Sequence, residues 1–409
     1  MARALGSGPR GRKFKSCLPD SVQISKMFES DTPKSGSDAG LYIHVPFCRT
    51  KCRYCGFYSR PIAAYDAGVV VSAMIAEMEQ QELGGDIRTI YIGGGSPSCL
   101  AQGHLLRLVG CAREHCPAAT EFTVEVNPGQ VDAELLLQLR KAGVNRLSVG
   151  AQSFIQRELD FLGRGYSVDC IGAAVQQARA AGFDNISLDL IFAVPGSCLD
   201  SWKHNLQQAI TLAVEHISAY SLTYEEGTPL DGDAAAGLVE RVDEDTDRAM
   251  YELTIDELAH AGMEQYEISN FARPGFECRH NLNYWANGSY AGIGPGAASY
   301  LQGTRSTNFA DIDRYVQAIT AGKSAAESSE TLTERQRACE TAVLNLRRRR
   351  GIDLAEFKSR TGFDAMELFA EPIRTYQEQG LIEQSGGRVS LTRHALGIAD
   401  SILCDFAVA

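Results

Sequence analysis

The feature that most constrains the fold is an alternation of short apolar runs with helix-like stretches, which begins at Leu41. Six of the apolar runs have the length and composition of buried strands. They cover residues 41–47, 89–93, 122–126, 146–150, 186–192 and 216–222. Alternating strands and helices favour right-handed crossovers and a parallel sheet. We therefore expect an α/β fold built as a partial (β/α)6 barrel of the TIM type.

Helix-capping residues mark several of the intervening stretches. Asp132, Asp169 and Asp200 each stand where a helix is expected to begin. Residues 243–261 read as a further helix, and residues 266–269 read as a short strand after it.

The two ends of the chain differ in character from the alternating part. Residues 1–39 are rich in Gly, Ser, Lys, Arg and Pro, a composition that predicts a flexible extension. The last hundred residues contain two or three helical segments and then a hairpin that turns at Gly386 and Gly387. We expect three parts: an extension at 1–39, the barrel at 40–300, and a smaller helical, winged-helix-like domain at 301–409.

Polar residues stand at the carboxyl end of each predicted strand. In α/β barrels this end of the strands carries the active site. After the first strand come the cysteines discussed below, and the later strand ends carry residues 93–96, Glu125 with Asn127, Gln152 with Ser153, Asp189, and Thr223 with Tyr224. One or two polar strand ends would mean little, but six in succession predict a single site at this face.

Three cysteines follow the first predicted strand, in the order Cys48-x3-Cys52-x2-Cys55. Thiolates are soft ligands that favour iron–sulfur clusters or zinc. A structural zinc ion normally takes four ligands in two separated pairs, and here Phe57 stands where a fourth cysteine could follow. The loop also carries Lys51 and two arginines, which suit an exposed thiolate site better than a packed core.

Charge and hydropathy exclude several classes of function. The net charge is −12, and this disfavours broad binding to nucleic acid. The basic run from Arg347 to Arg350 is interpreted as a solvated helix end. No apolar stretch approaches the roughly 20 residues of a membrane span, and no signal peptide is evident. The chain has 12 cysteines, which without a secretory signal favour a reducing compartment, so we expect a cytoplasmic protein.

The cysteine spacing resembles that of the radical S-adenosylmethionine (SAM) superfamily. The segment Tyr42-Ile-His-Val-Pro-Phe-Cys48 is similar to the corresponding segment of the oxygen-independent coproporphyrinogen oxidase family. This resemblance implies a [4Fe-4S] cluster on Cys48, Cys52 and Cys55, with one iron open to bind the methionine group of SAM. It extends from about Leu41 to the carboxyl terminus.

The same resemblance implies a set of contacts to SAM. The glycine run followed by Ser96 would contact the methionine group, although the family more often has Thr at that position. The residues that match cofactor contacts of the family are Tyr42, Gly94, Gly95, Ser96, Glu125, Gln152, Arg164, Asp189 and Thr223. Read without the family, Asp189 in an apolar run implies only a buried carboxylate that needs hydrogen-bond partners.

Three branches of the family need comparison. The oxidase branch usually has a fourth cysteine at the position of Phe57. The heme-chaperone branch, called HemW, is marked by Phe there and by a His-Asn-x-x-Tyr-Trp segment, which this chain has at 280–285. A third branch opens the heme ring by methyl transfer and radical chemistry, and Gly56 keeps it open as an alternative.

The heme-chaperone branch fits best, and it implies heme, SAM and the cluster as cofactors. It also implies heme-acceptor proteins such as respiratory enzymes as partners, and a dimer is a further expectation. His280 is the expected heme ligand because a neutral imidazole is a good axial ligand for iron. Cys278 is a weaker candidate. Read without the family, His280 and Trp285 are more simply a core histidine and a packing residue.

Overall fold

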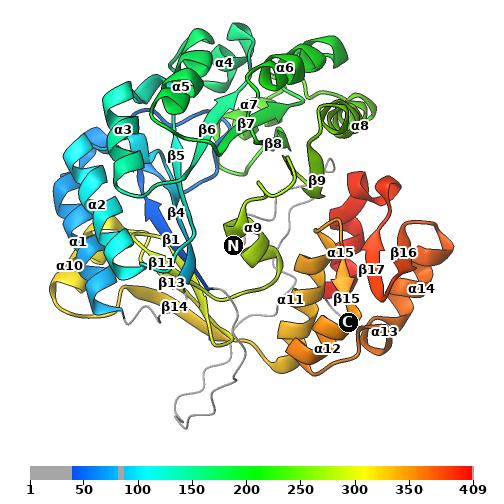
Figure 1. Cartoon of the computed structure of the whole chain (residues 1–409). Coiled ribbons are helices and arrows are strands. Elements are labelled where there is room, and N and C mark those ends of the chain that lie inside the picture. The colour runs from blue at the N-terminus through cyan, green and yellow to red at the C-terminus, as the bar shows by residue number, and fades with distance from the viewer. Residues whose placement is uncertain (1–38, 82–86, 408–409) are drawn as a thin grey trace.

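A computed structural model describes residues 39–81 and 87–407 of the chain. Its main feature is a 12-stranded sheet that curves around one side of the molecule (Figure 1). The six predicted strands are confirmed, and they lie side by side in chain order, all parallel. They are β1 (Ala39–Val45), β4 (Ile87–Gly94), β5 (Glu121–Val126), β6 (Arg146–Gln152), β7 (Ile186–Phe192) and β8 (His216–Ser221). The two edges of the sheet do not pair with each other, so the barrel is partial, as predicted.

Helices cover the convex face of this sheet (Figure 1). They are α1 (Ala67–Gln80), α2 (Gln102–His115), α3 (Ala133–Lys141), α4 (Gln156–Leu162), α5 (Asp169–Ala180), α6 (Leu199–Thr211), α8 (Glu244–His260) and α10 (Ile312–Thr320). Asp132 caps α3 through its carboxylate, as expected. The prediction that Asp200 begins α6 is wrong, because Cys198 is the cap residue and Ser201 completes a capping box with it. Short 3-10 turns lie at Ile62–Ala64, Pro97–Cys99 and Pro128–Gln130.

Further strands extend both edges of the parallel sheet. At one edge, β11 (Tyr290–Ile293) pairs in parallel with β1, and β12 (Ala298–Leu301), β13 (Thr304–Asn308) and β14 (Ala326–Thr331) follow in antiparallel order. At the other edge, β10 (Asn270–Ala272) and β9 (Glu264–Glu267) follow β8. The single strand predicted at 266–269 is wrong, since the chain turns at 268–269 and makes two strands there.

The chain leaves this large sheet only after β14. The predicted division between residues 300 and 301 falls inside β12, which pairs with strands on both sides. We therefore propose a domain boundary near residue 332. The predicted extension at 1–39 lies outside the described residues except for Ala39.

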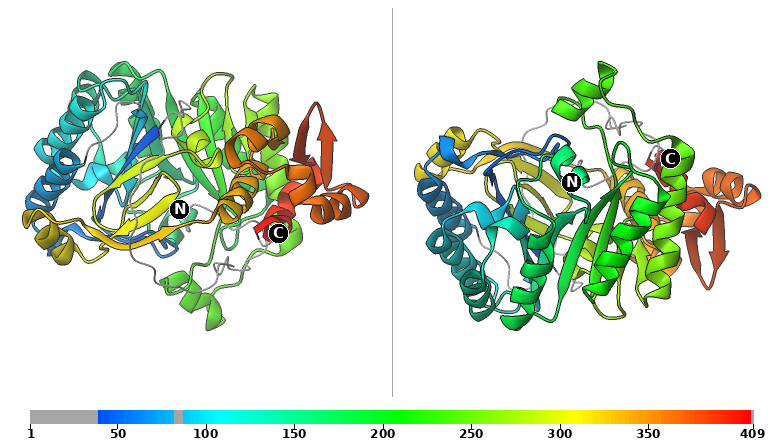
Figure 2. Two further views of the ribbon diagram at one scale, coloured as in Figure 1. Left: turned by 90° about the horizontal axis from the view of Figure 1, so that it is seen from below. Right: turned by 90° about the horizontal axis from the view of Figure 1, so that it is seen from above.

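The carboxyl-terminal domain packs beside the open edge of the sheet (Figure 2). Its helices are α11 (Glu334–Leu346), α12 (Leu354–Thr361), α13 (Ala365–Leu368), α14 (Ala370–Glu378) and α15 (Ala399–Ala407), with a 3-10 segment at Arg393–Ile398. Its small sheet consists of β15 (Ile352–Asp353), β16 (Ile382–Ser385) and β17 (Arg388–Leu391). The predicted hairpin is confirmed. Gly386 and Gly387 both have positive φ, as a tight hairpin turn requires.

The arginine run after α11 is not the solvated helix end that the sequence suggested. Arg347 and Arg348 are buried, and the segment lies against β9. Ile268 N donates to the carbonyl oxygen of Arg347 at 3.2 Å, and Arg349 N donates to that of Tyr266 at 3.0 Å. The run therefore joins the carboxyl-terminal domain to the barrel.

Two elements lie near the concave side of the barrel. Helix α9 (Arg279–Trp285) lies within the curve of the sheet and contacts β1 and β4 (Figure 1). Helix α7 (Pro229–Ala235) packs on the cysteine loop, where Arg53 and Asp233 form an ion pair at 2.5 Å. In the described part of the chain, no helix is both long enough and apolar enough to cross a membrane.

Candidate cofactor site in the barrel

The three cysteines lie on a loop that leaves β1. The short strand β2 (Phe47–Cys48) pairs with β3 (Arg60–Pro61), which holds the two ends of this loop together. Cys48, Cys52 and Cys55 are half-buried free thiols, and all three line one cavity of about 430 Å³. That volume lies within the usual range of ligand-binding cavities.

The donor set fits a cluster better than a single ion. Within residues 39–81 and 87–407, no three His, Cys, Asp or Glu side chains converge closely enough to hold one metal ion. A four-iron cluster has a different requirement, because each thiolate binds a different iron atom. Three thiols on one loop therefore match a cluster with one iron left open.

The cavity brings together the thirteen residues expected to contact the cluster, SAM or heme. They are Tyr42, Cys48, Cys52, Cys55, Gly94, Gly95, Ser96, Glu125, Gln152, Arg164, Asp189, Thr223 and His280. They come from six parallel strands and the segments that follow them, from the cysteine loop, from the turn after α4 and from α9. Ser153 and Tyr224, which the sequence placed at the same strand ends, do not line the cavity. The structure thus assembles the predicted site in space, while the role of each residue in it remains a prediction.

The glycine run at the end of β4 forms backbone hydrogen bonds with the segment that leads into the cysteine loop. Gly95 N donates to the carbonyl oxygen of Val45 at 2.9 Å, and Ser96 N donates to that of Phe47 at 2.7 Å. A Cβ atom on Gly95 would collide with that same Phe47 carbonyl, and Gly94 has a φ of +104°. Only glycine permits this close backbone approach and this conformation.

Two buried carboxyl groups face the middle of the cavity. Glu125 accepts a hydrogen bond from Tyr91 Oη at 2.8 Å and one from Gly94 N at 3.2 Å. Ser148 Oγ donates its single hydrogen to the carboxyl group of Asp189, whose two oxygens lie 3.1 and 3.0 Å away. Burial raises the pKa of Glu125 to about 7 and also raises that of Asp189. Glu125 can therefore exchange a proton near neutral pH, and both groups can accept hydrogen bonds from a ligand.

Arg164 joins the cysteine loop to the barrel wall. Its Nη1 donates to Cys52 Sγ at 3.3 Å, and its Nη2 donates to the carbonyl oxygen of Gly150 at 3.0 Å. Burial raises the pKa of the Cys55 thiol to about 11 and also raises that of Cys48. A guanidinium in this place lowers the cost of the thiolates that iron requires.

Gln152 sits at the end of β6 in an unusual backbone conformation. Its φ is +62°, in the left-handed region that costs a non-glycine residue about 1–2 kcal/mol. The pairing of β6 with β7 is irregular at the same point. Strain of this kind collects at functional sites, and here it turns the Gln152 side chain into the cavity.

His280 lies at the opposite end of the cavity from the cysteines and is almost fully buried. Its Nδ1 shares a hydrogen bond with Thr89 Oγ1 at 2.8 Å, and its Nε2 shares one with Tyr284 Oη at 3.0 Å. Its ring also stacks on Tyr91, with 5.2 Å between the ring centroids. Burial lowers the pKa of His280 to about 3, so the ring is neutral. Both nitrogens already have partners, as in a structural core histidine.

Cys278 does not line the cavity. It is buried, its thiol contacts Glu121 Oε1 at 3.6 Å, and burial raises its pKa to about 12. The weaker suggestion that Cys278 binds heme remains a prediction, and the cavity lining gives it no support.

Comparisons with known proteins agree with this geometry. The Radical SAM superfamily model matches residues 42–209, and the HemN C-terminal domain model matches residues 332–397. Heme chaperone HemW of Lactococcus lactis is 34% identical over 367 residues, which are 89% of this chain and 96% of that protein. Heme chaperone HemW of Bacillus subtilis is 34% identical over 371 residues, with 89% and 98% covered. The chain belongs to the HemW family.

A solved structure shows the same fold. Coproporphyrinogen III oxidase (HemN) from Escherichia coli, a radical SAM enzyme, superposes with a TM-score of 0.79 and 21% identity, over 91% of this chain and 90% of that one. At that identity the likeness concerns the fold alone. It confirms the radical SAM type of α/β barrel with a smaller carboxyl-terminal domain.

Sequence reasoning missed several residues of this HemW-family cavity. Arg146 and Ser148 also face it, because alternate residues of β6 point inward, down to the start of the strand. That alternation could have found them. Arg347 faces the cavity from the carboxyl-terminal domain, and no local pattern in the sequence could have shown this.

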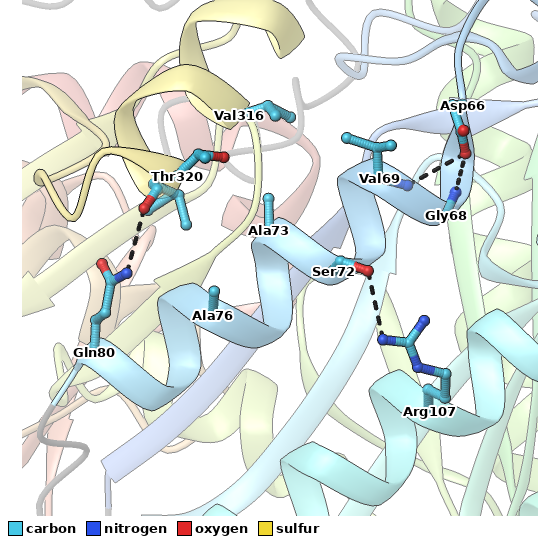
Figure 3. A pocket seen from close by; sticks show the side chains of 11 residues that line it. Asp66, Gly68, Val69, Ser72, Ala73, Ala76, Gln80, Arg107, Val316 and Thr320 are labelled. Atoms are coloured by element: carbon cyan, nitrogen blue, oxygen red, sulfur yellow. Dashed lines mark hydrogen bonds between the residues drawn. The ribbon is translucent and has the colours of Figure 1, made fainter.

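A second hollow, of about 670 Å³, lies on the outside of the barrel between α1, α2 and α10 (Figure 3). It is crossed by hydrogen bonds from Arg107 to Ser72 Oγ at 3.4 Å and from Gln80 to the carbonyl oxygen of Ile319 at 3.3 Å. None of the predicted site residues lines it. Although this hollow is larger, the chemistry-bearing side chains all face the inner cavity.

Proposed function

We propose that this protein is a heme chaperone that holds a [4Fe-4S] cluster, binds SAM in the barrel cavity, and delivers heme to acceptor proteins such as respiratory enzymes. The observation that carries the proposal is the single cavity that joins the cysteine loop to the His280 segment. Membership of the HemW family supports it. A dimer is part of the same proposal.

The residues at the cysteine end of the cavity suit the cluster and SAM. Cys48, Cys52 and Cys55 would hold three iron atoms, and Gly94 and Gly95 line the part of the cavity that lies against the cysteine loop. When bound, the cluster and SAM supply the means to cleave a sulfonium by one electron. The protein's own part is to position groups: Arg164, Gln152, Glu125 and Asp189 offer donors and acceptors to the ligand, and Thr223 closes the same side.

For heme, we propose that His280 becomes an axial ligand only after a local rearrangement. Nε2 must exchange the hydroxyl of Tyr284 for iron, while Nδ1 keeps its bond to Thr89 and holds the ring in place. The neutral ring that burial maintains is the form that binds iron. An optical titration tests this, because loss of an imidazole ligand changes the heme absorption spectrum.

The alternative function is that of an oxygen-independent coproporphyrinogen III oxidase. The likeness in fold to the E. coli oxidase keeps it in view. Phe57 argues against it, since it stands at the mouth of the cavity in place of a fourth cysteine and is 53% exposed. A heme-degrading methyltransferase is a further alternative from the sequence, and the intact segment at 280–285 speaks against it.

One anaerobic experiment separates these functions. The cluster-loaded protein is incubated with SAM and a reductant, in parallel with heme and with coproporphyrinogen III, and the products are analysed. We expect bound, unaltered heme and no conversion of the porphyrinogen. Formation of decarboxylated product would favour the oxidase, and ring-opened product would favour the methyltransferase.

For location, we propose the cytosol. Imaging of the full-length tagged chain tests it, and import directed by the first 38 residues would show another compartment.

A further inference from the structure

The inner end of the cavity contains a buried arginine with an unsatisfied hydrogen-bond donor. Arg146 begins β6, and only 2% of its surface is exposed. Its Nε has no hydrogen-bond partner among the described residues. Three carboxyl groups, Glu121, Glu125 and Asp189, act on its charge through space. All three already accept hydrogen bonds from other groups, and those of Glu121 come from Arg279 N and His280 N of α9 at 2.9 Å each. Burying a guanidinium with an unsatisfied N–H group costs free energy unless a ligand accepts its hydrogen bond.

A second buried donor faces the same end of the cavity. Trp285 closes α9, is 7% exposed, and its Nε1 also has no partner in the described part of the chain. An indole N–H is a donor only, so the group that completes it must be an acceptor.

The carboxyl-terminal domain supplies a third donor. Arg347 lines the cavity with a side chain that is 3% exposed. Its guanidinium lies 5.1 Å from the centre of the Trp285 ring and forms an ion pair with Asp400 of α15 at 2.9 Å. Its position is therefore fixed from both sides, as a preorganised binding group requires.

Two hydrogen-bond acceptors also lie at the inner end of the cavity. Oε2 of Glu267 and Oδ1 of Asn270 lack partners among the described residues. Burial raises the pKa of Glu267, so that carboxyl is more easily neutralised, whereas both arginines stay charged at every physiological pH. The two unsatisfied donors, Arg146 Nε and Trp285 Nε1, still require an acceptor, and an anionic acceptor would match the charge of the guanidinium.

We propose that this inner wall, formed by Arg146, Trp285 and Arg347, binds a carboxylate group of the heme that the chain carries. Guanidinium groups match the planar geometry of a carboxylate and bind it with paired hydrogen bonds. Heme carries two carboxylates on one edge of the macrocycle, so the wall would fix the orientation in which heme enters. This inference rests on the proposed function, since it presupposes that heme is the cargo.

The test compares heme with its dimethyl ester, which lacks the carboxylate charges. Both are titrated into the cluster-loaded full-length protein, the Arg146→Gln and Arg347→Gln variants, and Arg350→Gln as a matched control. Arg350 belongs to the same run but is 50% exposed and does not line the cavity. We expect the wild-type chain to prefer heme over the ester by about ten- to a hundredfold, the range of one charge-assisted contact. Each inner-wall substitution should reduce that preference, and the control should keep it.

The possible results distinguish a failure of the proposed heme-binding function from a failure of the carboxylate subsite alone. If the wild-type chain binds neither compound, the proposed function fails and the inference fails with it. If the wild-type chain binds heme and ester equally, or both inner-wall variants keep the full preference, heme binding stands and the carboxylate subsite is overturned. If Arg146→Gln fails to fold, the preference of the wild-type chain for heme over the ester, and its change in Arg347→Gln, still test the proposal.

A carboxylate could also come from SAM, so SAM binding is measured on the same proteins. Arg164 lies at the cysteine end of the cavity and Arg146 at the other, so we expect unchanged SAM affinity in Arg146→Gln. Loss of SAM binding with heme binding intact would assign the inner wall to SAM and overturn the proposal.

Discussion

Arg164 Nη1 donates a hydrogen bond to Cys52 Sγ at 3.3 Å, while Nη2 of the same guanidinium holds the carbonyl oxygen of Gly150. One side chain thus fixes the middle cysteine of the loop to the end of β6. The contact therefore sets the position of the Cys52 sulfur relative to the barrel wall.

We predict that Arg164→Ala weakens cluster assembly and SAM binding together. Loss of one charge-assisted hydrogen bond should cost about 1.5–3 kcal/mol, or roughly a tenfold or greater loss of affinity. Iron and sulfide content after anaerobic reconstitution, followed by equilibrium dialysis of SAM, measures both effects. Arg157→Ala is the control, because Arg157 is exposed, donates to the carbonyl oxygen of Gly196 and does not line the cavity. Equal behaviour of the two variants would contradict the prediction.

The cysteine assignment has its own test. Replacing Cys48, Cys52 and Cys55 with Ala should abolish the broad thiolate-to-iron absorption of the reconstituted protein. The fold should persist, because the loop is only half-buried and its ends are held by β2 and β3. Circular dichroism checks the fold. Cys198→Ala, an exposed cysteine away from the cavity, should reconstitute normally. A cluster that survives the triple substitution would remove these residues as ligands.

The parts of the fold that the sequence predicted are those governed by local pattern. The six parallel strands follow from their apolar runs, and the cap at Asp132 follows from its side chain. The strand-end rule for α/β barrels also placed Glu125 and Gln152 at one site, since parallel strands bring their ends together. These residues lie close in space for a topological reason that can be inferred without coordinates. Asp189 stands in the middle of β7 and lines the same cavity from there.

What the sequence did not predict depends on contacts between distant segments. The run at Arg347 reads as solvated because four like charges on a short segment usually are. Its burial depends on β9, about 80 residues earlier, and on Asp400. The division that we propose near residue 332 differs from the predicted one for a similar reason, because β14 consists of exposed, mostly polar residues and is recognisable as a strand by its pairing with β13.

We predict that His280→Ala destabilises the protein whether or not heme is bound. The substitution leaves Thr89 Oγ1 and Tyr284 Oη without their buried partner and opens a space beside Tyr91. Together these effects should cost about 2–5 kcal/mol. Denaturant unfolding of the heme-free protein measures this loss. An unchanged midpoint would show that His280 is not the structural residue that its hydrogen bonds indicate.

Heme titration of the same variant separates the two roles of His280. If Nε2 exchanges Tyr284 for iron, the spectrum of the bound heme should change as well as its affinity. Weaker binding with an unaltered spectrum would assign to His280 a positioning role only. His104→Ala is a suitable comparison, because His104 lies on α2 outside the cavity.

The raised pKa of Glu125 predicts a specific dependence of the protein's stability on pH. Burial raises its pKa in the folded state to about 7, whereas the unfolded chain keeps the ordinary value of about 4.3. Between these values the folded state binds more protons than the unfolded state, so this group makes stability fall as pH rises through that window. Neutral buried histidines such as His280 act in the opposite direction, with stability rising from about pH 3 to 6.5.

The contribution of Glu125 is therefore measured as the difference in stability between the wild-type protein and a variant that lacks this carboxyl group. Glu125→Gln keeps the size of the side chain and cannot ionise, so it should match the wild-type protein near pH 4 and be more stable by up to about 3 kcal/mol at pH 8. Unfolding by urea across that range measures the difference, and a gap that does not grow with pH would show that Glu125 is not held protonated by its surroundings.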